Sequence, residues 1–315
     1  MSEMKKMSKI YVIGGCIIDI QGAVVETLRL HDSNPGKIAY SYGGVARNVA
    51  ENLAHLKEDV YLVSVLGTDV FGENMYQYCA ESGIKMDYVL RSNDYATSSY
   101  MAILDENREM YVAVVDTSIL ALLTKEYIES VLDKITEEDI LIVDTNLDVD
   151  LIQYIVENSS CPLYLDPIST KKAEKIKDCL GAFHFLKPNN FEAETLSGIS
   201  VKNEKEILDF FIAQGVKEVA ISMGEDGVIA SNGVEHLHIR HERVTPVNPT
   251  GAGDSFMAAY LWARRQGKQF QESLEIACAV AICTLLDEKT VTQSLSYDKI
   301  EQVRKEMNIR GERIC

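Results

Sequence analysis

The 315-residue sequence lacks the features that define several broad classes of protein. Its 6 prolines are too few for a collagen-like chain, and 46% hydrophobic residues are too many for a disordered one. The two longest apolar runs, residues 10–18 and 276–286, are far shorter than the roughly 20 residues that a membrane-spanning helix needs. The sequence therefore predicts a folded, soluble protein that has no membrane partner.

Cysteine is present without the spacing of a structural site. The seven cysteines are odd in number and scattered, and no two of them form a C-x-x-C pair. This pattern argues against a disulfide framework and against a zinc ribbon. Because free thiols are typical of reducing compartments, we expect the protein in the cytoplasm.

Positive charge is scarce. Against 48 Asp and Glu there are 31 Lys and Arg, which gives a formal net charge of −17. A field of this sign repels the phosphates of nucleic acids and anionic lipids, so we expect no nucleic acid partner. A small anionic cosubstrate remains possible, because the N–H groups at a helix start bind phosphate without help from net charge.

Short apolar runs alternate with segments of helical periodicity. Five runs are expected as buried strands: residues 10–18, 60–66, 139–144, 163–166 and 219–222. The later runs are each followed by an amphipathic stretch, which indicates βαβ units and a parallel sheet. The predicted fold class is therefore α/β.

Two segments interrupt this rhythm. Residues 23–42 and 88–115 lack helical periodicity and are rich in Val, Thr and Tyr at alternating positions. We expect them to form a small antiparallel sheet made from two insertions. Since no Pro/Gly/Ser-rich linker divides the chain, residues 1–315 are interpreted as one domain.

The most informative motif is Asn-Pro-Thr-Gly-Ala-Gly-Asp at 248–254, which runs directly into a helical pattern. Gly251 and Gly253 allow close approach of the backbone to a ligand, and the helix start directs free N–H groups to the same place. We expect an anion there. Asp254, in the first turn, either stabilises the helix or acts as a base beside the anion.

Two further motifs involve residues near the start of the chain. Gly43 and Gly44 precede a helical pattern in which Asn48 lies off the apolar stripe; they form either a plain turn or part of a ligand site. Asp19 follows the first expected strand, and ligands of open α/β sheets bind at the carboxyl ends of strands. Its carboxylate either accepts hydrogen bonds from vicinal hydroxyls or is a solvated turn residue.

Two motifs in the second half of the chain follow strand-like segments. Asn189 and Glu192 are three residues apart at a helix start, where Glu192 either holds a hydrated Mg²⁺ or completes a capping box. The segment from Ser222 through Gly224 to Gly227 ends a strand with a glycine-bearing turn. Taken alone, that segment is an ordinary hairpin.

In this order and at these separations, the motifs resemble the ribokinase or PfkB family of carbohydrate and nucleoside kinases, from Ile10 to about residue 295. The resemblance implies a ribokinase-like three-layer α/β/α core with a mainly parallel sheet. The two insertions then correspond to a β-sheet lid over the acceptor, which implies a homodimer formed through the lid. ATP and Mg²⁺ are the implied cofactors, and a small nucleoside or sugar is the implied partner.

The resemblance also implies roles for individual residues. Asp254 matches the general base, and the amides of Gly251, Ala252 and Gly253 match an anion hole for the transferred phosphoryl group. The acceptor-binding positions are Asp19, Gly43, Gly44 and Asn48. The nucleotide-binding positions are Asn189, Ser222, Gly224, Gly227 and Thr250, with Glu192 binding Mg²⁺ through water.

Within the family, residues 43–48, 110–116, 144–147 and 287–291 are similar to pseudouridine kinases. This similarity implies phosphorylation of the 5′ hydroxyl of pseudouridine, with Thr97 and Asp116 of the lid near the base. Two alternatives remain: a ribokinase- or fructokinase-like sugar kinase, and a non-catalytic sensing protein on the same fold. The family implies a primary-hydroxyl acceptor in either kinase case.

One position departs from the family pattern. Asn248 stands where an aspartate commonly begins the 248–254 motif, and that aspartate helps to bind a monovalent cation in many members. With one negative charge fewer, such a cation site is weaker. We therefore expect little activation by potassium.

Overall fold

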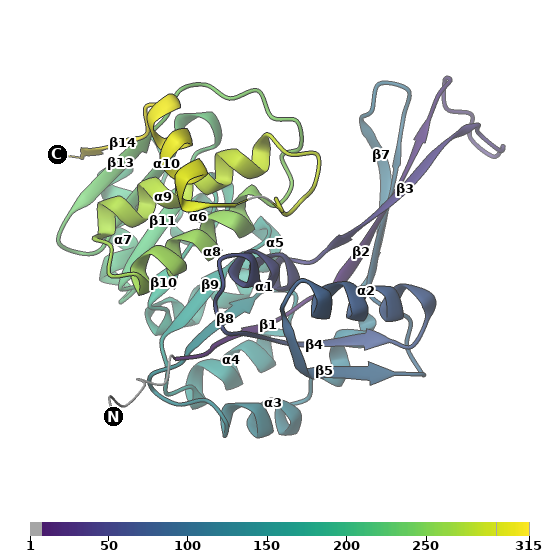
Figure 1. Cartoon of the computed structure of the whole chain (residues 1–315), viewed down its shortest axis with the longest axis horizontal. Helices are drawn as coiled ribbons and strands as arrows, with labels where there is room; N and C mark the ends of the chain where they lie inside the picture. Colours follow the sequence, from purple (N-terminus) through teal and green to yellow (C-terminus); the bar gives the residue numbers. More distant parts are fainter. Residues whose placement is uncertain (1–7, 294, 315) are drawn as a thin grey trace.

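The core of the protein is a large, mainly parallel sheet. The computed structural model describes residues 8–293 and 295–314, and within them ten strands join in the order β14-β13-β12-β11-β10-β9-β8-β1-β4-β5 (Figure 1). In this spatial order, neighbouring strands from β11 through β1 to β5 pair in parallel. The strands β12, β13 and β14 extend the β11 edge by antiparallel pairing. Their bounds are β1 (Ile10–Ile13), β4 (Val60–Gly67), β5 (Lys85–Ser92), β8 (Ile140–Asp144), β9 (Leu163–Asp166), β10 (Phe185–Leu186), β11 (Glu218–Ser222), β12 (Val228–Ser231), β13 (His236–Arg240) and β14 (Arg310–Arg313).

The apolar runs form strands because both faces of the sheet are covered. In β1, Ile10 and Val12 pack into one apolar cluster while Tyr11 and Ile13 pack into another on the opposite face. All four side chains are buried. Alternate side chains of a strand point to opposite faces, so a strand covered on both sides is a continuous apolar run.

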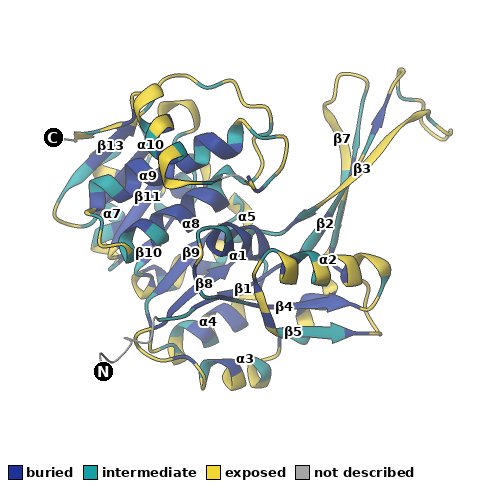
Figure 2. Cartoon of the chain, viewed as in Figure 1, coloured by how far each residue is buried: buried dark blue, intermediate teal, exposed yellow. Residues whose placement is uncertain are grey.

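Helices form the two outer layers. One face carries α1 (Val45–His55), α2 (Val70–Glu81), α8 (Ala252–Arg265), α9 (Phe270–Leu285) and α10 (Tyr297–Glu306). The other carries α3 (Lys125–Leu132), α4 (Val149–Asn158), α6 (Asn190–Ser197) and α7 (Glu204–Ala213), with α5 (Thr170–Ala173) and the 3₁₀ segments η1 (Ser118–Leu122) and η2 (Glu174–Ala182) beside them. Figure 2 shows the buried side of these helices turned to the sheet. The predicted three-layer α/β/α class is thereby confirmed. No helix in the described part of the chain is both long and apolar enough to cross a bilayer.

A second, smaller sheet projects from the body (Figure 1). Its order is β3-β2-β6-β7, with β2 (Ile17–Val24), β3 (Gly36–Gly43), β6 (Ser99–Leu104) and β7 (Met110–Asp116). We call these four strands the lid. Many of its side chains are exposed, because no helix layer covers the outer part of this sheet (Figure 2).

Three predictions about these strands were wrong in detail. The run 10–18 holds two strands, because the chain leaves the core at 14–16 and enters the lid, so Asp19 lies within β2. Residues 88–92 belong to β5 of the core. The lid is also mixed, since β2 and β6 are parallel; the long crossover between them permits that direction. Apolar alternation identifies a strand but does not identify its neighbours.

Candidate active site

The site lies where the strand order reverses. From β1 the chain builds β4 and β5 on one side and β8 onward on the other, and open α/β sheets bind ligands at such a point. The Asp144 carboxylate, at the end of β8, accepts hydrogen bonds from Gly15 N (3.0 Å) and Ala46 N (3.1 Å). Burial raises its pKa, and these donors oppose that rise. Asp144 thus fixes the loop after β1 and the start of α1 to the core.

The start of α8 has the shape expected for an anion site. Gly251 precedes the helix with φ of 85°, and a Cβ there would lie 2.1 Å from the Thr290 carbonyl oxygen, so only glycine fits. The first bond within α8 is donated by Ser255 N to the Gly251 carbonyl oxygen, so the N–H groups of residues 251–254, which include the predicted anion-hole amides of 251–253, have no acceptor within the helix. A Cβ on Gly253 would lie 3.0 Å from Lys187 Nζ, which brings a cation to the same place.

Asp254 is buried in the first turn of α8, and Asn48 Nδ2 of α1 donates a hydrogen bond of 2.6 Å to its Oδ2. Burial, together with the charge of Asp166, raises the pKa of Asp254 to about 7. The Asn48 hydrogen bond and the cations Lys187 and Arg47 act in the opposite direction. A carboxylate with a pKa near neutrality is suited to accept a proton.

Lys187 and Asp166 form a buried ion pair that the sequence motifs did not assign. Lys187 Nζ lies 2.9 Å from Asp166 Oδ2, at the ends of β10 and β9. Burial lowers the pKa of Lys187, but Asp166, Glu192 and Asp254 raise it further than burial lowers it, so the ammonium stays charged. The sequence did contain a signal for this pair, because Asp166 and Lys187 are charged residues at the ends of two successive strand-like segments.

Asn189 and Glu192 make the capping box that was one of the two alternatives for them. Glu192 N donates to Asn189 Oδ1 (2.9 Å), and Asn189 N donates to Glu192 Oε2 (2.8 Å). Glu192 is 2% exposed, and burial together with Asp166 raises its pKa. Within the described residues, no three His, Cys, Asp or Glu side chains form a metal-binding group. The Mg²⁺ role of Glu192 stays a prediction.

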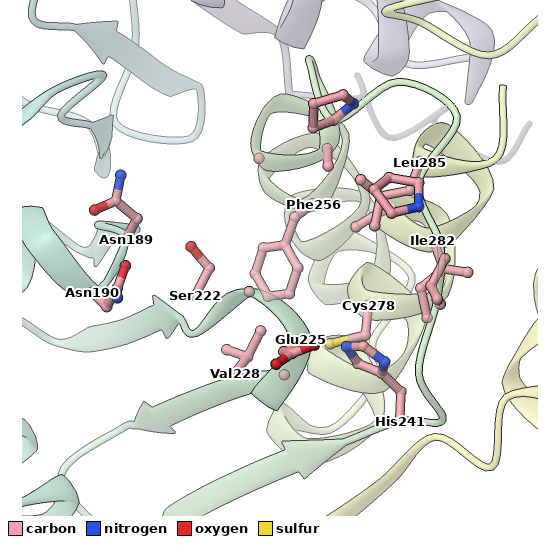
Figure 3. Close-up of a pocket in the computed structure, with 18 of the residues that line it drawn as sticks. Asn189, Asn190, Ser222, Glu225, Val228, His241, Phe256, Cys278, Ile282 and Leu285 are labelled. Carbon is pink, nitrogen blue, oxygen red and sulfur yellow. The ribbon is translucent and has the colours of Figure 1, made fainter. Parts of the chain in front are cut away.

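A cavity of about 510 Å³ joins the motifs of the second half of the chain. Ser222 ends β11, Gly224 begins the 3₁₀ turn η3 (Gly224–Asp226), and Gly227 follows that turn and leads into β12. Opposite them is an apolar wall from α8 and α9, with the Phe256 ring near the centre of the view in Figure 3. The site residues predicted from sequence that line this cavity are Asn189, Ser222, Gly224, Gly227, Ala252 and Gly253.

A second cavity of about 340 Å³ lies between the lid and the loop that precedes α8. Asp19, Gln21 and Tyr40 line it from β2 and β3. Thr250, predicted on the nucleotide side, lines this second cavity instead. The left-handed turn at Gly251 separates Thr250 from Ala252, which lines the first cavity, and sequence spacing does not reveal that change of direction.

Asp19 lies against Gly43 across the β2–β3 pair. A Cβ on Gly43 would be 2.0 Å from Asp19 Oδ2, so the carboxylate occupies the space of the absent side chain. Gly44, the next residue, is the N-cap of α1 and approaches the Gly15 carbonyl oxygen in the same way. Burial raises the pKa of Asp19 to about 6, and Arg47 opposes that rise.

The structure does not bring Thr97 and Asp116 into either cavity. Thr97 is buried, where its hydroxyl donates to Asp69 and accepts from Gly67 N. Asp116 is exposed at the end of β7, and its Oδ1 accepts from the backbone and hydroxyl of Ser118. Both side chains thus make local hydrogen bonds, and their role at the base stays a prediction.

Comparison with known proteins agrees with this geometry. The pseudouridine kinase of Escherichia coli is 35% identical over 302 residues, which are 94% of this chain and 96% of that protein. A carbohydrate kinase structure from Agrobacterium tumefaciens matches with a TM-score of 0.85 and 29% identity, covering 98% of this chain and 100% of its own. The ribokinase of Thermotoga maritima, at 22% identity, shares the fold with a TM-score of 0.83 over 95% of this chain and 99% of its own.

The sequence-based assignment to a kinase family is confirmed over most of the chain. Residues 7–296 match the profile of the pfkB family carbohydrate kinases. The match covers the lid, every strand of the core sheet except β14, and the start of α8, and residues on either side of Gly251 there line the two cavities. The chain therefore belongs to the pfkB family of carbohydrate kinases, which are ATP-dependent phosphotransferases acting on small sugars or nucleosides.

Proposed function

We propose that the enzyme transfers the γ-phosphoryl group of ATP to the 5′ hydroxyl of pseudouridine, giving pseudouridine 5′-phosphate and ADP. The observation that carries this acceptor is the 35% identity to a pseudouridine kinase over nearly the full length of both proteins. The chemistry is supported by the buried carboxylate of Asp254 in the first turn of α8; the residues just before it line the first cavity (Ala252, Gly253) and the second (Thr250).

In the proposed reaction Asp254 is the general base. Asn48 holds its Oδ2, and we assign proton uptake from the acceptor hydroxyl to Oδ1. The hydroxyl oxygen then bonds to the γ-phosphorus, the bond from phosphorus to the β-phosphate oxygen breaks, and ADP leaves. The N–H groups of residues 251–253 and the Lys187 ammonium stabilise the negative charge of the transferred group.

Glu192 is the proposed Mg²⁺ position, with water between the carboxylate and the ion. Its Oε2 is fixed by the Asn189 N–H, so the carboxylate is held rigidly beside the nucleotide cavity. Mg²⁺ keeps several of its waters and needs few protein ligands, which suits a single fixed carboxylate. When bound, the ion neutralises phosphate charge.

Asp19 is the proposed partner of the ribose hydroxyls, with Gly43, Gly44 and Asn48 completing that side of the site. Its carboxylate lines the second cavity and accepts two hydrogen bonds in this role. Gln21 and Tyr40 line the same cavity and offer an amide and an aromatic ring to the base. Water would compete with the acceptor for the phosphoryl group, so lid closure over this cavity supports specificity as well as rate.

The proposed working form is a cytoplasmic homodimer joined through the lid, with no nucleic acid or membrane partner. Ile38 is 82% exposed and Val114 67% exposed on the lid, and apolar side chains so exposed favour an interface. Val114→Glu should shift the mass measured by light scattering to that of a monomer. A wild-type chain that is monomeric at assay concentration would overturn the dimer.

A panel of acceptors tests the proposed reaction. ADP release is measured with pseudouridine, uridine, ribose and fructose at saturating ATP. We expect kcat/KM for pseudouridine to exceed the other values at least about tenfold, because a site that pairs the extra ring N–H of pseudouridine rejects an acceptor that leaves the pairing group unbonded. A preference for ribose or a hexose would refute pseudouridine as the acceptor but leave the kinase activity standing. If no phosphoryl group is transferred to any of these acceptors, both the acceptor and the kinase activity are refuted.

A further inference from the structure

A buried arginine lies next to the proposed base and belongs to none of the motif roles described above. Arg47, on α1, is 1% exposed. Its Nε donates to the Gly43 carbonyl oxygen (3.0 Å) and its Nη2 to that of Tyr42 (2.7 Å), both at the end of β3. The same guanidinium donates to Asn48 Oδ1 and forms an ion pair with Glu51.

The contact with Asn48 determines which way that amide faces. With Oδ1 turned to Arg47, Nδ2 is the group that meets Asp254 Oδ2, at 2.6 Å. An amide rotated by half a turn would place NH₂ donors against the guanidinium and would place Oδ1 against the carboxylate. Both contacts would be repulsive. Arg47 therefore selects the amide orientation that donates to Asp254.

The charges around these groups act together. Asp254 faces Asp166, Lys187 and Arg47, and the positive charge of Arg47 favours the ionised form of Asp254. Arg47 also favours the ionised form of Asp19 at the lid root, by which we mean the end of β3 at Tyr42 and Gly43 together with the facing part of β2 at Asp19. On its far side Arg47 faces Glu51, whose Oε1 accepts a hydrogen bond of 2.6 Å from the Tyr78 hydroxyl, and the uncharged thiols of Cys16 and Cys79.

We propose that Arg47 is a positioning residue for phosphoryl transfer, which fixes the Asn48 amide and thereby keeps Asp254 oriented and ionised for proton uptake. The inference rests on the proposed role of Asp254 as base. Its physical basis is that one planar guanidinium donates in several fixed directions at once, which an ammonium does not do. Because two of those bonds reach the end of β3, the same residue sets the position of the lid root relative to the base.

The competing explanation is that Arg47 only neutralises Glu51. The double variant Arg47→Met with Glu51→Met removes that pair and keeps most of the volume, and such apolar replacements of a buried ion pair usually preserve folding. The matched variant Glu51→Gln keeps the guanidinium and its bond to Asn48. The first readout is the pH titration of the Asp254 carboxyl carbon by NMR in ¹³C-aspartate-labelled protein, assigned with Asp254→Asn.

We expect the midpoint of the Asp254 titration to rise by about one pH unit in the double variant and to stay level or fall in Glu51→Gln. With the acceptor chosen from the panel, kcat/KM of the double variant should then fall about tenfold more at pH 6 than at pH 9, since one unit is a tenfold change in the ionised fraction. An unchanged midpoint and an unchanged pH profile in the double variant would show that Arg47 serves only Glu51.

Arg47→Lys separates charge from orientation and keeps the test decisive if the double variant does not fold. The lysine retains a positive charge but does not reach Glu51, Asn48 and both carbonyls together. We expect an Asp254 midpoint within about half a unit of wild type and a kcat at least about tenfold lower, measured below the melting temperature of the variant, which should fall because buried acceptors lose their donor. A kcat within twofold of wild type would overturn the positioning role. If Asp254→Asn stays active, the proposed base is wrong, while the titration still decides whether Arg47 controls Asp254.

Discussion

Replacing Asp254 with Asn should abolish turnover and, at the same time, stabilise the protein in a pH-dependent way. The amide keeps the size of the carboxylate and keeps an oxygen for the hydrogen bond from Asn48. It removes the proton acceptor, a loss that typically lowers the rate about 10²- to 10⁴-fold. It also removes a charge that is buried beside Asp166, which is why the two effects are linked.

The size of the stability effect follows from the pKa of Asp254, which is raised from 3.8 to about 7 by burial and by Asp166. Between these values the native protein binds a proton that the unfolded chain has released, so wild-type stability falls as the pH rises and levels off above about 7. From pH 5 to pH 8 this spans about two units, or about 3 kcal/mol. Asp254→Asn has no such titrating group and does not lose this stability, so the difference in unfolding free energy between the variant and wild type should grow by about 3 kcal/mol from pH 5 to pH 8.

Thermal melts at pH 5 and pH 8 and a coupled ADP assay measure both effects. At roughly 2 °C per kcal/mol for a chain of this size, the melting-temperature advantage of the variant should be roughly 6 °C larger at pH 8 than at pH 5. Asp133→Asn, at an exposed position after α3, is the control and should show no such change. Retention of more than about a tenth of wild-type kcat would exclude Asp254 as the base, and an equal advantage at both pH values would refute the charge-burial argument.

Three further predictions concern the ligands. Asp19→Ala should raise the acceptor KM at least about tenfold and leave the ATP KM unchanged, because a charged hydrogen-bond acceptor of roughly 1.5–3 kcal/mol is lost; unchanged acceptor kinetics would remove Asp19 from the site. Glu192→Gln should raise the Mg²⁺ concentration for half-maximal rate, whereas a variant that only melts earlier would assign Glu192 to the capping box alone. Replacing sodium with potassium at constant ionic strength should change kcat less than twofold, because Asn248 is neutral and its amide is bonded to the Glu288 carbonyl oxygen; a several-fold rise would contradict this.

The sequence by itself determined the fold class and the composition of the site. The run 163–166 became the core strand β9 with the expected bounds, because a strand buried on both faces is mainly apolar; its one charged residue, Asp166, pairs with Lys187. The glycines of the 248–254 motif indicated a helix start open to a ligand, and the positive φ of Gly251 with its close contact to the Thr290 carbonyl oxygen explains why no other residue fits at that position. These features are local, so a short window of sequence contains them.

Tertiary structure alone decided which of these residues meet. Asn48 and Asp254 are 206 positions apart, and their hydrogen bond depends on how α1 and α8 pack on one face of the sheet. The direction of the turn at Gly251 places Thr250 in the cavity beside the lid. The position of Asp116 at the end of β7 leaves its carboxylate bonded to Ser118. The partners of Arg47 and Lys187 were likewise invisible, because a buried cation is defined by the groups around it, and those come from elements that only the folded chain brings together.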